Sequence, residues 1–206
     1  MSPKVSQEHK ERRRAKILDA ARNVFIKYGF EKATMKHIME ESSVSRGGLY
    51  QYFSNKEDVM KVVLEEELDV FSEKINATLS NQPSSYWKTL QELLLTSHDD
   101  NNEVLTDPLT PAKIEFHLTS KNDEQRLIFA KKRYKHFLNI YARIIKEGQQ
   151  KGEFSSKYEA EVIAGSIISF TDGVYIGYDV LSKEVELKKQ MNLFVDSLKF
   201  TLGVEH

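Results

Sequence analysis

The sequence predicts an all-α protein, because three of its features favour helices over strands. Glu, Lys, Leu and Ile are abundant and recur with the 3.6-residue period of an amphipathic helix. The 206 residues include only four prolines, and runs of alternating apolar and polar residues are few. A chain of this length forms one large or two small domains with a proper hydrophobic core. We divide it into an N-terminal three-helix domain, residues 1–54, and a larger C-terminal helical domain, residues 55–206.

The composition excludes several kinds of chemistry. The chain has no cysteine, which rules out disulfides, thiolate metal sites and cysteine nucleophiles. It lacks a glycine-rich phosphate loop, and we expect no cofactor. Neither the first residues nor any later segment has the apolar run of a signal peptide or a membrane helix. We therefore expect a cytoplasmic protein without a membrane partner.

Charge is distributed unevenly along the chain, although the net charge is only −1. Residues 1–60 contain twelve Lys or Arg against eight Asp or Glu, whereas the remainder contains 18 against 23. A basic N-terminal part on an acidic remainder is expected where one end of a protein approaches a polyanion. A chance fluctuation or a basic disordered tail explains the same numbers, so charge alone does not decide.

The first helix is predicted from about residue 8 to residue 28, with Gly29 as its C-terminal stop. Its basic first half precedes the apolar stripe, so this half can project as an arm. The residues expected on the apolar face are Ile17, Ala20, Ala21, Val24, Phe25 and Tyr28.

Two short helices follow. Thr34 caps a second helix at residues 35–41, and after a turn at residues 42–44 Ser45 caps a third helix at residues 46–52. The residues expected to face inward are Met35, Ile38, Leu49 and Phe53. Two short helices joined by such a turn and braced by a longer one make a helix-turn-helix, whose second helix can lie in a DNA major groove.

The first turn of the third helix contains Gly47 and Gly48, although each glycine costs a helix interior roughly 1 kcal/mol relative to alanine. Glycines let the backbone of this turn approach base edges and phosphates closely. Tyr50 and Tyr52 lie on different faces, so one or both hydroxyls can bond phosphate oxygens, and Lys56 adds a positive charge nearby. Ordinary core packing of the tyrosines, with hydroxyls at the rim, is the alternative.

These residues resemble a known family. TMKHIMEESSVSRGGLYQYFSNKEDVM, residues 34–60, is similar to the helix-turn-helix signature of the TetR family of bacterial transcription regulators. ILDAARNVFIKYGFEKAT resembles that family's first helix, and IIKEGQQKGEFSS and SIISFTDGV resemble its helix-junction and dimer-helix patterns. The resemblance implies a DNA-binding site formed by Thr34, Lys36, Ser45, Arg46, Gly47, Gly48, Tyr50, Tyr52 and Lys56.

The chain departs from the family pattern at two positions. Ser43 stands where the family commonly has glycine, so it must adopt a left-handed conformation or use a different turn. Gly48 stands where the family commonly has threonine, serine or alanine, which removes a possible hydroxyl contact. Arg46 is then the candidate for direct base readout, for which guanine is the usual partner.

The C-terminal domain is expected to consist of long helices. Apolar periodicity predicts helices at residues 55–79, 123–150, 157–181 and 185–202, and another that starts near residue 86. Residues 98–111 are polar with two prolines, which predicts a loop. His98 beside Asp99 and Asp100 suggests a metal site, but a solvated loop is the preferred interpretation, and we predict no metal.

Aromatic side chains in this domain allow a cavity for a flat or bulky apolar ligand with a few polar anchors. Most such side chains are simply core, and His117 in particular is explained as a satisfied core or surface histidine. The cavity is favoured by the resemblance, because in the family this domain binds a small inducer. The candidate lining residues are Phe71, Trp87, Phe116, His117, Tyr134, Phe137, Tyr141, Phe170 and Tyr175.

The last two helices have small or apolar residues on faces that another helix can approach. The resemblance implies that this pair docks on its twofold mate as a four-helix interface, whereas an intramolecular core explains the same pattern. A short recognition helix with few base-reading side chains also favours two copies on one operator.

The sequence therefore predicts a ligand-responsive regulator, a repressor, that binds a palindromic DNA operator as a homodimer and is released by a small aromatic or apolar effector. One alternative is a helical small-molecule-binding or enzymatic protein whose basic head does not read DNA sequence. Another is an interaction module whose head binds membrane or RNA. No metalloprotease, paired-acid or Ser-His-Asp motif supports an enzyme, and we expect none.

Overall fold

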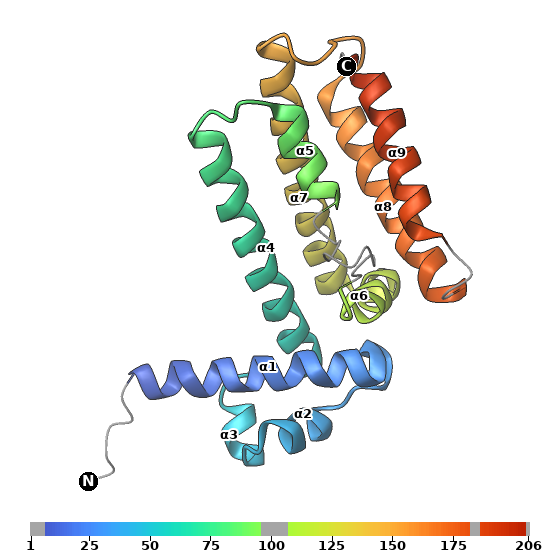
Figure 1. The fold of residues 1–206 in the computed structure, drawn as a ribbon. Coiled ribbons are helices and arrows are strands. Elements are labelled where there is room, and N and C mark those ends of the chain that lie inside the picture. The colour runs from blue at the N-terminus through green and yellow to red at the C-terminus, as the bar shows by residue number, and fades with distance from the viewer. Residues whose placement is uncertain (1–6, 96–106, 182–185, 205–206) are drawn as a thin grey trace. The chain divides into compact units, whose positions relative to one another are not determined.

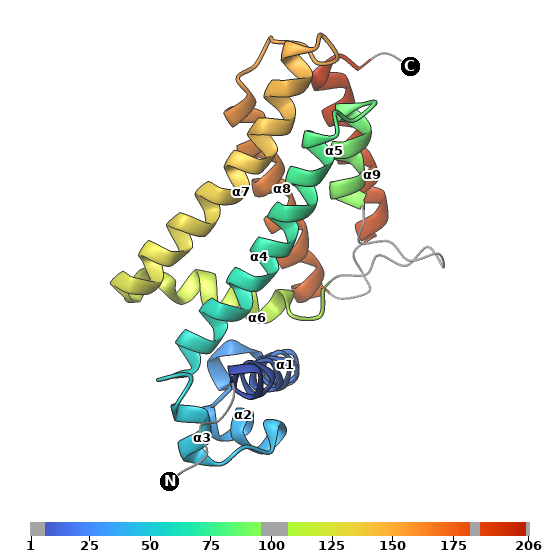
Figure 2. The ribbon, with the colours of Figure 1, turned by 90° about the vertical axis from the view of Figure 1, so that its left-hand side faces the viewer.

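The computed structural model describes residues 7–95, 107–181 and 186–204. Within these residues it contains helices and no strand, which confirms the all-α prediction (Figures 1 and 2). The chain divides into two compact units. Unit 1 joins the N-terminal part, as far as Val70, to residues 108–123, and unit 2 holds the other described residues.

Unit 1 combines the three N-terminal helices with two later segments. It contains α1 (Gln7–Lys32), α2 (Met35–Ser42), α3 (Arg46–Tyr50), the first part of α4 (Lys56–Ser80), α6 (Thr110–Leu118) and the short 3-10 helix η1 (Thr119–Asn122). Both views show α2 and α3 on one side of α1, and the start of α4 and α6 on the other. Within unit 1, the α2–α3 side is therefore left uncovered by α4 and α6.

Gly29 interrupts α1 at the position where the sequence predicts a stop. Its backbone has φ 71° and ψ 174°, a conformation almost restricted to glycine, and the helical segment then extends to Lys32. Phe30 is buried directly after this break and packs edge-on against Phe116 of α6, with 4.8 Å between ring centroids. The prediction that Tyr28 faces inward is wrong. Tyr28 is 36% exposed, and its ring stacks on that of His37 in α2, with 4.4 Å between ring centroids, rather than entering the core.

The helix-turn-helix has the predicted caps. The Thr34 hydroxyl accepts a hydrogen bond from the His37 amide at 3.2 Å, and α2 begins at the next residue after Thr34. Ser43 ends α2 in the left-handed conformation, with φ 53° and ψ 36°, and its amide donates to the carbonyls of Met39 and Glu40. Of the two possibilities for this serine, the structure adopts the left-handed one, at some cost in backbone strain.

Helix α6 and η1 are not among the predicted elements. Most of the expected loop, residues 98–106, lies outside the described residues, but α6 begins at Thr110, inside that loop. Pro111 lies in the first turn of α6, where the missing proline N–H breaks no helical hydrogen bond. The apolar side of α6 buries Ala112 and Phe116 in unit 1.

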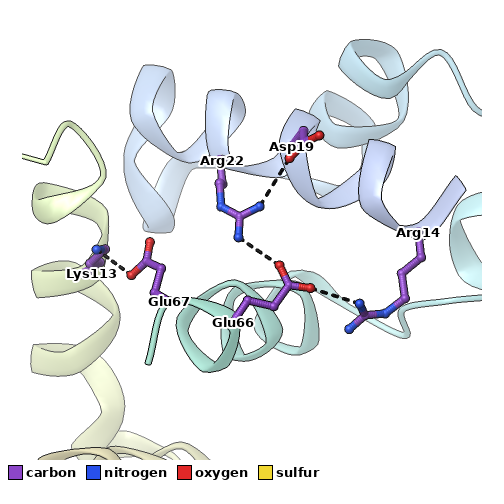
Figure 3. A network of polar contacts seen from close by, with 6 residues as sticks. All are labelled: Arg14, Asp19, Arg22, Glu66, Glu67 and Lys113. Atoms are coloured by element: carbon purple, nitrogen blue, oxygen red, sulfur yellow. Dashed lines mark hydrogen bonds and ion pairs between the residues drawn. The ribbon is translucent and has the colours of Figure 1, made fainter. Parts of the chain in front are cut away.

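Charged side chains tie α4 to α1 and to α6 within unit 1 (Figure 3). The Glu66 carboxylate accepts hydrogen bonds from Arg14 Nη1 at 3.0 Å and from Arg22 Nη2 at 2.9 Å. Its neighbour Glu67 pairs with Lys113 of α6 at 2.7 Å. All five side chains are partly buried, so solvent screens these pairs less than fully exposed ones. Two arginines of the basic first helix are thus held by the protein itself.

A second carboxylate connects α6 to the break in α1. Glu115 accepts a hydrogen bond from the Glu31 amide at 2.9 Å, and Thr119 Oγ1 donates to the Glu31 carboxylate at 3.1 Å. A Cβ atom added to Gly29 would lie only 2.8 Å from each carboxylate oxygen of Glu115. The backbone of α1 and the side chain of α6 therefore meet closely at the break.

Unit 2 contains the remainder of α4 with α5 (Tyr86–Leu95), α7 (Glu124–Gln150), α8 (Ala160–Leu181) and α9 (Leu187–Leu202). Helix α7 packs against α5 and α8, and α9 packs against α5 and α8. The predicted ends of α7, α8 and α9 agree with the structure, and the predicted starts differ by at most three residues. The most deeply buried side chains of this core are Leu90, Ile144, Ile145, Ala164, Ile167 and Leu202.

The connection after α7 caps the start of α5. Glu153 Oε1 accepts hydrogen bonds from the Ser85 hydroxyl at 2.6 Å and the Trp87 amide at 2.9 Å. Its other oxygen accepts from the Tyr86 amide at 2.8 Å. These amides have no partner within their own helix, so one carboxylate satisfies donors that the helix leaves open.

The compact units do not follow the boundary expected between residues 54 and 55. Residues 56–70 and 108–123 pack with the three N-terminal helices in unit 1. This division arises because α4 and α6 pack on α1. Local sequence patterns do not predict such contacts between distant segments. The assignment of functions to residues 1–54 and 55–206 remains a prediction.

Candidate nucleic-acid interface

The short helix α3 is held from its inner side. Leu49 is fully buried and Phe53, just beyond the helix, is 4% exposed, as the sequence predicts. The Ser45 hydroxyl accepts a hydrogen bond from the Gly48 amide at 3.2 Å and caps the first turn. The helix ends at Tyr50, two residues before the predicted end. Because its inner side is fixed, the outer side chains have a defined direction.

The outer side of α3 presents a cation and an aromatic hydroxyl. Arg46, Gly47 and Tyr50 are exposed, and the Arg46 guanidinium lies 5.7 Å from the centroid of the Tyr50 ring. Tyr50 is 46% exposed, so the core-packing alternative is wrong for this residue. Tyr52 is half-buried, which matches a tyrosine that packs at the rim of the core. Guanidinium and phenol groups in this arrangement can donate hydrogen bonds to phosphate or base oxygens.

The candidate residues of α2 lie at its start. Thr34 is exposed, and although its oxygen accepts the cap bond, its O–H can still donate to another group. Lys36 is exposed, and its nearest carboxylate is Glu40, 3.7 Å away on the same helix. An ion pair of this kind contributes little to stability, so the Lys36 ammonium can exchange it for a phosphate.

Lys56 has a role that the sequence does not indicate. Its ammonium group donates hydrogen bonds of 2.8 Å to the carbonyls of both Phe30 and Glu31 and lies 4.6 Å from the Phe30 ring centroid. It thereby satisfies backbone carbonyls near the end of α1. One N–H remains for other partners, and its contact with the DNA backbone stays a prediction.

Arg13 belongs to this surface but is absent from the residues that the sequence singles out. A Cβ atom added to Gly48 would overlap the Nη2 atom of Arg13, whereas one added to Gly47 would meet nothing within 4 Å. The only sequence signal is the run of arginines at residues 12–14, which does not reveal which of them faces α3.

The aromatic candidates for an effector site fall into both units. Phe71 and Phe137 lie together in unit 2, with 5.6 Å between ring centroids. Trp87, Tyr141 and Phe170 are partly buried against the same core, and Tyr175 is half-buried. Phe116 and His117 belong to unit 1, where Phe116 packs on Phe30 and His117 is exposed. Tyr134, also a candidate lining residue, is 39% exposed.

One hydroxyl in unit 2 lies in a strongly dehydrated place. Burial, followed by the nearby Tyr175 and Asp172, raises the pKa of Tyr141 to about 12. At neutral pH a tyrosine phenol is protonated with or without this shift, and the Tyr141 hydroxyl can donate a hydrogen bond.

The described residues contain no set of three His, Asp or Glu side chains placed to hold a metal ion. The sequence His98-Asp99-Asp100 lies outside this part of the chain. In the same part of the chain, every helix is too short or too polar to cross a membrane.

A capped short helix with an outward arginine, packed on α1 and α2 within unit 1, defines a helix-turn-helix protein with an additional helical unit. Two family descriptions match the sequence. They are "Bacterial regulatory proteins, tetR family", for residues 17–63, and "Tetracyclin repressor-like, C-terminal domain", for residues 90–188. The chain belongs to the TetR family of bacterial transcriptional regulators.

Individual relatives agree with this assignment. The HTH-type transcriptional regulator YfiR of Bacillus subtilis is 36% identical over 174 residues, which cover 84% of this chain and 83% of the relative. A TetR transcription regulator from Haloarcula marismortui has a similar solved structure, with a TM-score of 0.77, 18% identity and 93% and 98% coverage of the two chains. The regulator FadR of Bacillus subtilis, solved in complex with stearoyl-CoA, has a TM-score of 0.69, 21% identity and 93% and 99% coverage.

Proposed function

We propose that this protein is a cytoplasmic repressor that binds a palindromic operator as a homodimer and is released by a small apolar effector. The observation that carries the proposal is the geometry of α3. Leu49 and Phe53 anchor the helix from inside, and Arg46, Gly47 and Tyr50 face outward. A helix held in this way presents its first turn to a major groove in a fixed orientation.

On the DNA, two kinds of contact have separate roles. Arg46 reads a base edge, and its guanidinium matches the two acceptors of guanine. Thr34, Lys36 and Tyr50 bind phosphates and fix the register of the helix without reading sequence. Tyr52 and Lys56 contribute from the rim of the same surface.

Dimerisation is supported by apolar side chains that unit 2 leaves exposed. On α9, Leu193 is 68% exposed and Phe200, seven residues later on the same face, is 88% exposed. On α8, Val162 is 60% and Ile176 is 40% exposed. The opposite faces of both helices are buried within unit 2, so an intramolecular core accounts for one face of each helix only. A second copy of the chain would cover the other face.

The effector belongs to unit 2 in this proposal. The Phe71–Phe137 pair and the protonated Tyr141 hydroxyl offer apolar contacts and a polar anchor of the expected kind. The structure of FadR with stearoyl-CoA gives a precedent for a ligand with a long apolar part in a protein of similar fold. Flat aromatic and acyl ligands are therefore the compounds to test first.

The chain offers three covalent connections between the units, at residues 70–71, 107–108 and 123–124. An effector that favours one conformation of unit 2 can act on α4 and α6 through them. Effector and operator then weaken each other's binding by the same factor. Under this proposal the protein regulates transcription and has no enzymatic activity.

Selection of bound duplexes from a random pool tests the proposal. We expect a palindromic sequence, bound by two chains or a multiple of two, with at least about a thousandfold preference over a scrambled duplex. Binding should weaken steeply with salt. Recovery of duplexes without a common sequence would refute the DNA-reading function.

A panel of acyl and aromatic compounds then tests the effector. A true effector raises the melting temperature of the protein and also lowers its affinity for the selected duplex. A compound that changes the melting temperature and leaves DNA affinity unchanged would argue against the coupling.

A further inference from the structure

The two adjacent glycines of α3 have different surroundings. A Cβ atom on Gly47 would extend into open space. A Cβ atom on Gly48 would overlap Arg13 Nη2 and lie 3.1 Å from both Arg13 Cζ and Ser45 Oγ. The place where a side chain of α3 would begin is therefore occupied by the guanidinium of an α1 residue.

The neighbours of Arg13 in the sequence are both paired with acids. Arg12 lies 3.2 Å from Glu8, and Arg14 lies 3.0 Å from Glu66. Arg13 has no carboxylate partner among the residues that the structure describes. It is half-buried against α3 beside Gly48, which follows the exposed cation Arg46 by two residues in the sequence.

The Arg13 guanidinium can bind an anion in this position. Its planar fork of N–H donors matches the oxygens of a phosphate group, and no carboxylate in the described part of the chain pairs with it. Two cations, Arg13 and Arg46, near the first turn of α3 repel each other in the free protein. A bound polyanion makes the same arrangement favourable.

We propose, on the basis of the proposed DNA-binding function, that Arg13 is a DNA phosphate-binding residue of the recognition surface. Gly48 leaves out a side chain so that this guanidinium can lie at the surface of α3. Arg13 of α1 thereby supplies a polar contact in place of the hydroxyl contact that α3 lacks at Gly48. Because its partner is a phosphate, the contact strengthens binding to all duplexes and reads no base.

The first test compares Arg13→Ala with Arg12→Ala, which removes the same charge from the neighbouring exposed arginine. Each variant is titrated against the selected operator and its scrambled version at several salt concentrations. We expect Arg13→Ala to weaken binding about tenfold on both duplexes and to reduce the salt slope by about one. Arg12→Ala should change affinity less than about twofold. Unchanged affinity in Arg13→Ala, or a loss confined to the operator, would overturn the phosphate assignment.

The second test uses the glycines. Gly48→Ala is compatible with the fold, because the atoms that overlap the added Cβ are the end of the flexible Arg13 side chain, the Ser45 hydroxyl at 3.1 Å has to move only slightly, and alanine is the better helix former. We expect Gly48→Ala to keep or raise the melting temperature and to weaken DNA binding by displacing Arg13. Adding Arg13→Ala to Gly48→Ala should then cause little further loss, whereas the effects of Gly47→Ala and Arg13→Ala should add. Additive losses for Gly48→Ala and Arg13→Ala would contradict the proposal.

These results separate the inference from the function on which it rests. If the wild-type protein binds no selected duplex, the DNA-binding function itself fails. If the wild-type protein binds and Arg13→Ala binds equally well, only the role of Arg13 fails.

Discussion

The Glu153 carboxylate gives a sharp prediction about stability, because one side chain holds three donors at the start of α5. Replacement of Glu153 by alanine leaves the Ser85 hydroxyl and the amides of Tyr86 and Trp87 without this acceptor. Hydrogen bonds to a charged group contribute roughly 1.5–3 kcal/mol each when water is excluded. Because Glu153 is only half-buried, water replaces part of this energy. We therefore expect a total loss of about 2 kcal/mol, or roughly 4–8 °C in melting temperature.

The same contacts predict how this contribution depends on pH. Burial raises the pKa of Glu153, but hydrogen bonds from the Ser85 hydroxyl and the Trp87 and Tyr86 amides outweigh burial and hold it below its ordinary value. The folded-state pKa is thus lower than the unfolded-state pKa. The stabilisation is fully present above the unfolded pKa and is lost as pH falls through the folded pKa. The difference in unfolding free energy between wild type and Glu153→Ala should therefore narrow as the pH falls below the ordinary pKa of a glutamate side chain.

Thermal and urea unfolding, followed by circular dichroism at pH 7 and at pH 3.5, measures both effects. Glu161→Ala is the matched control, because Glu161 pairs with Lys146 at the exposed surface and should contribute little. An equal loss in the two variants, or a Glu153→Ala difference that does not shrink in acid, would refute the reasoning.

Further predictions concern other parts of the chain. Arg46→Ala should reduce the preference of the protein for the operator over scrambled DNA, and equal losses of affinity on both duplexes would contradict this. Lys56→Ala should lower the affinity for all duplexes about equally. It should also lower the melting temperature, since Lys56 bonds the carbonyls near the end of α1. Ser43→Gly should raise the free energy of unfolding by about 0.5–1 kcal/mol in chemical denaturation, because glycine adopts the left-handed turn without strain. Replacing both Leu193 and Phe200 with glutamate should give a folded monomer in sedimentation velocity; a folded dimer would place the interface elsewhere.

Local signals predicted the helices well, because caps and apolar periodicity are properties of neighbouring residues. Thr34 and Ser45 start their helices where expected, and Leu49 and Phe53 are buried as expected. The sequence does not indicate α6, because Pro108 before the helix and Pro111 resemble a loop signal, although Pro111 is compatible with the first helical turn in which it lies.

The features that the sequence did not reveal depend on contacts between distant segments. The position of Arg13 beside Gly48 joins residues 35 apart, and the bonds from Lys56 to Phe30 and Glu31 join residues 26 and 25 apart. Neither apolar periodicity nor the rules of helix capping predict contacts between residues so far apart in the sequence. The same limit applies to the effector site, for which aromatic residues were identified by type and the fold distributed them between two units.

Gly29 is constrained twice, by independent causes. Its backbone angles exclude side chains, and the Glu115 carboxylate fills the space that a side chain would need. Shortening the Glu115 side chain would relieve the crowding but would leave the unfavourable backbone angles at position 29. A second substitution at position 115 therefore cannot compensate for the replacement of Gly29. In a saturation library screened for folded protein, position 29 should therefore tolerate no other residue, whatever partner stands at position 115.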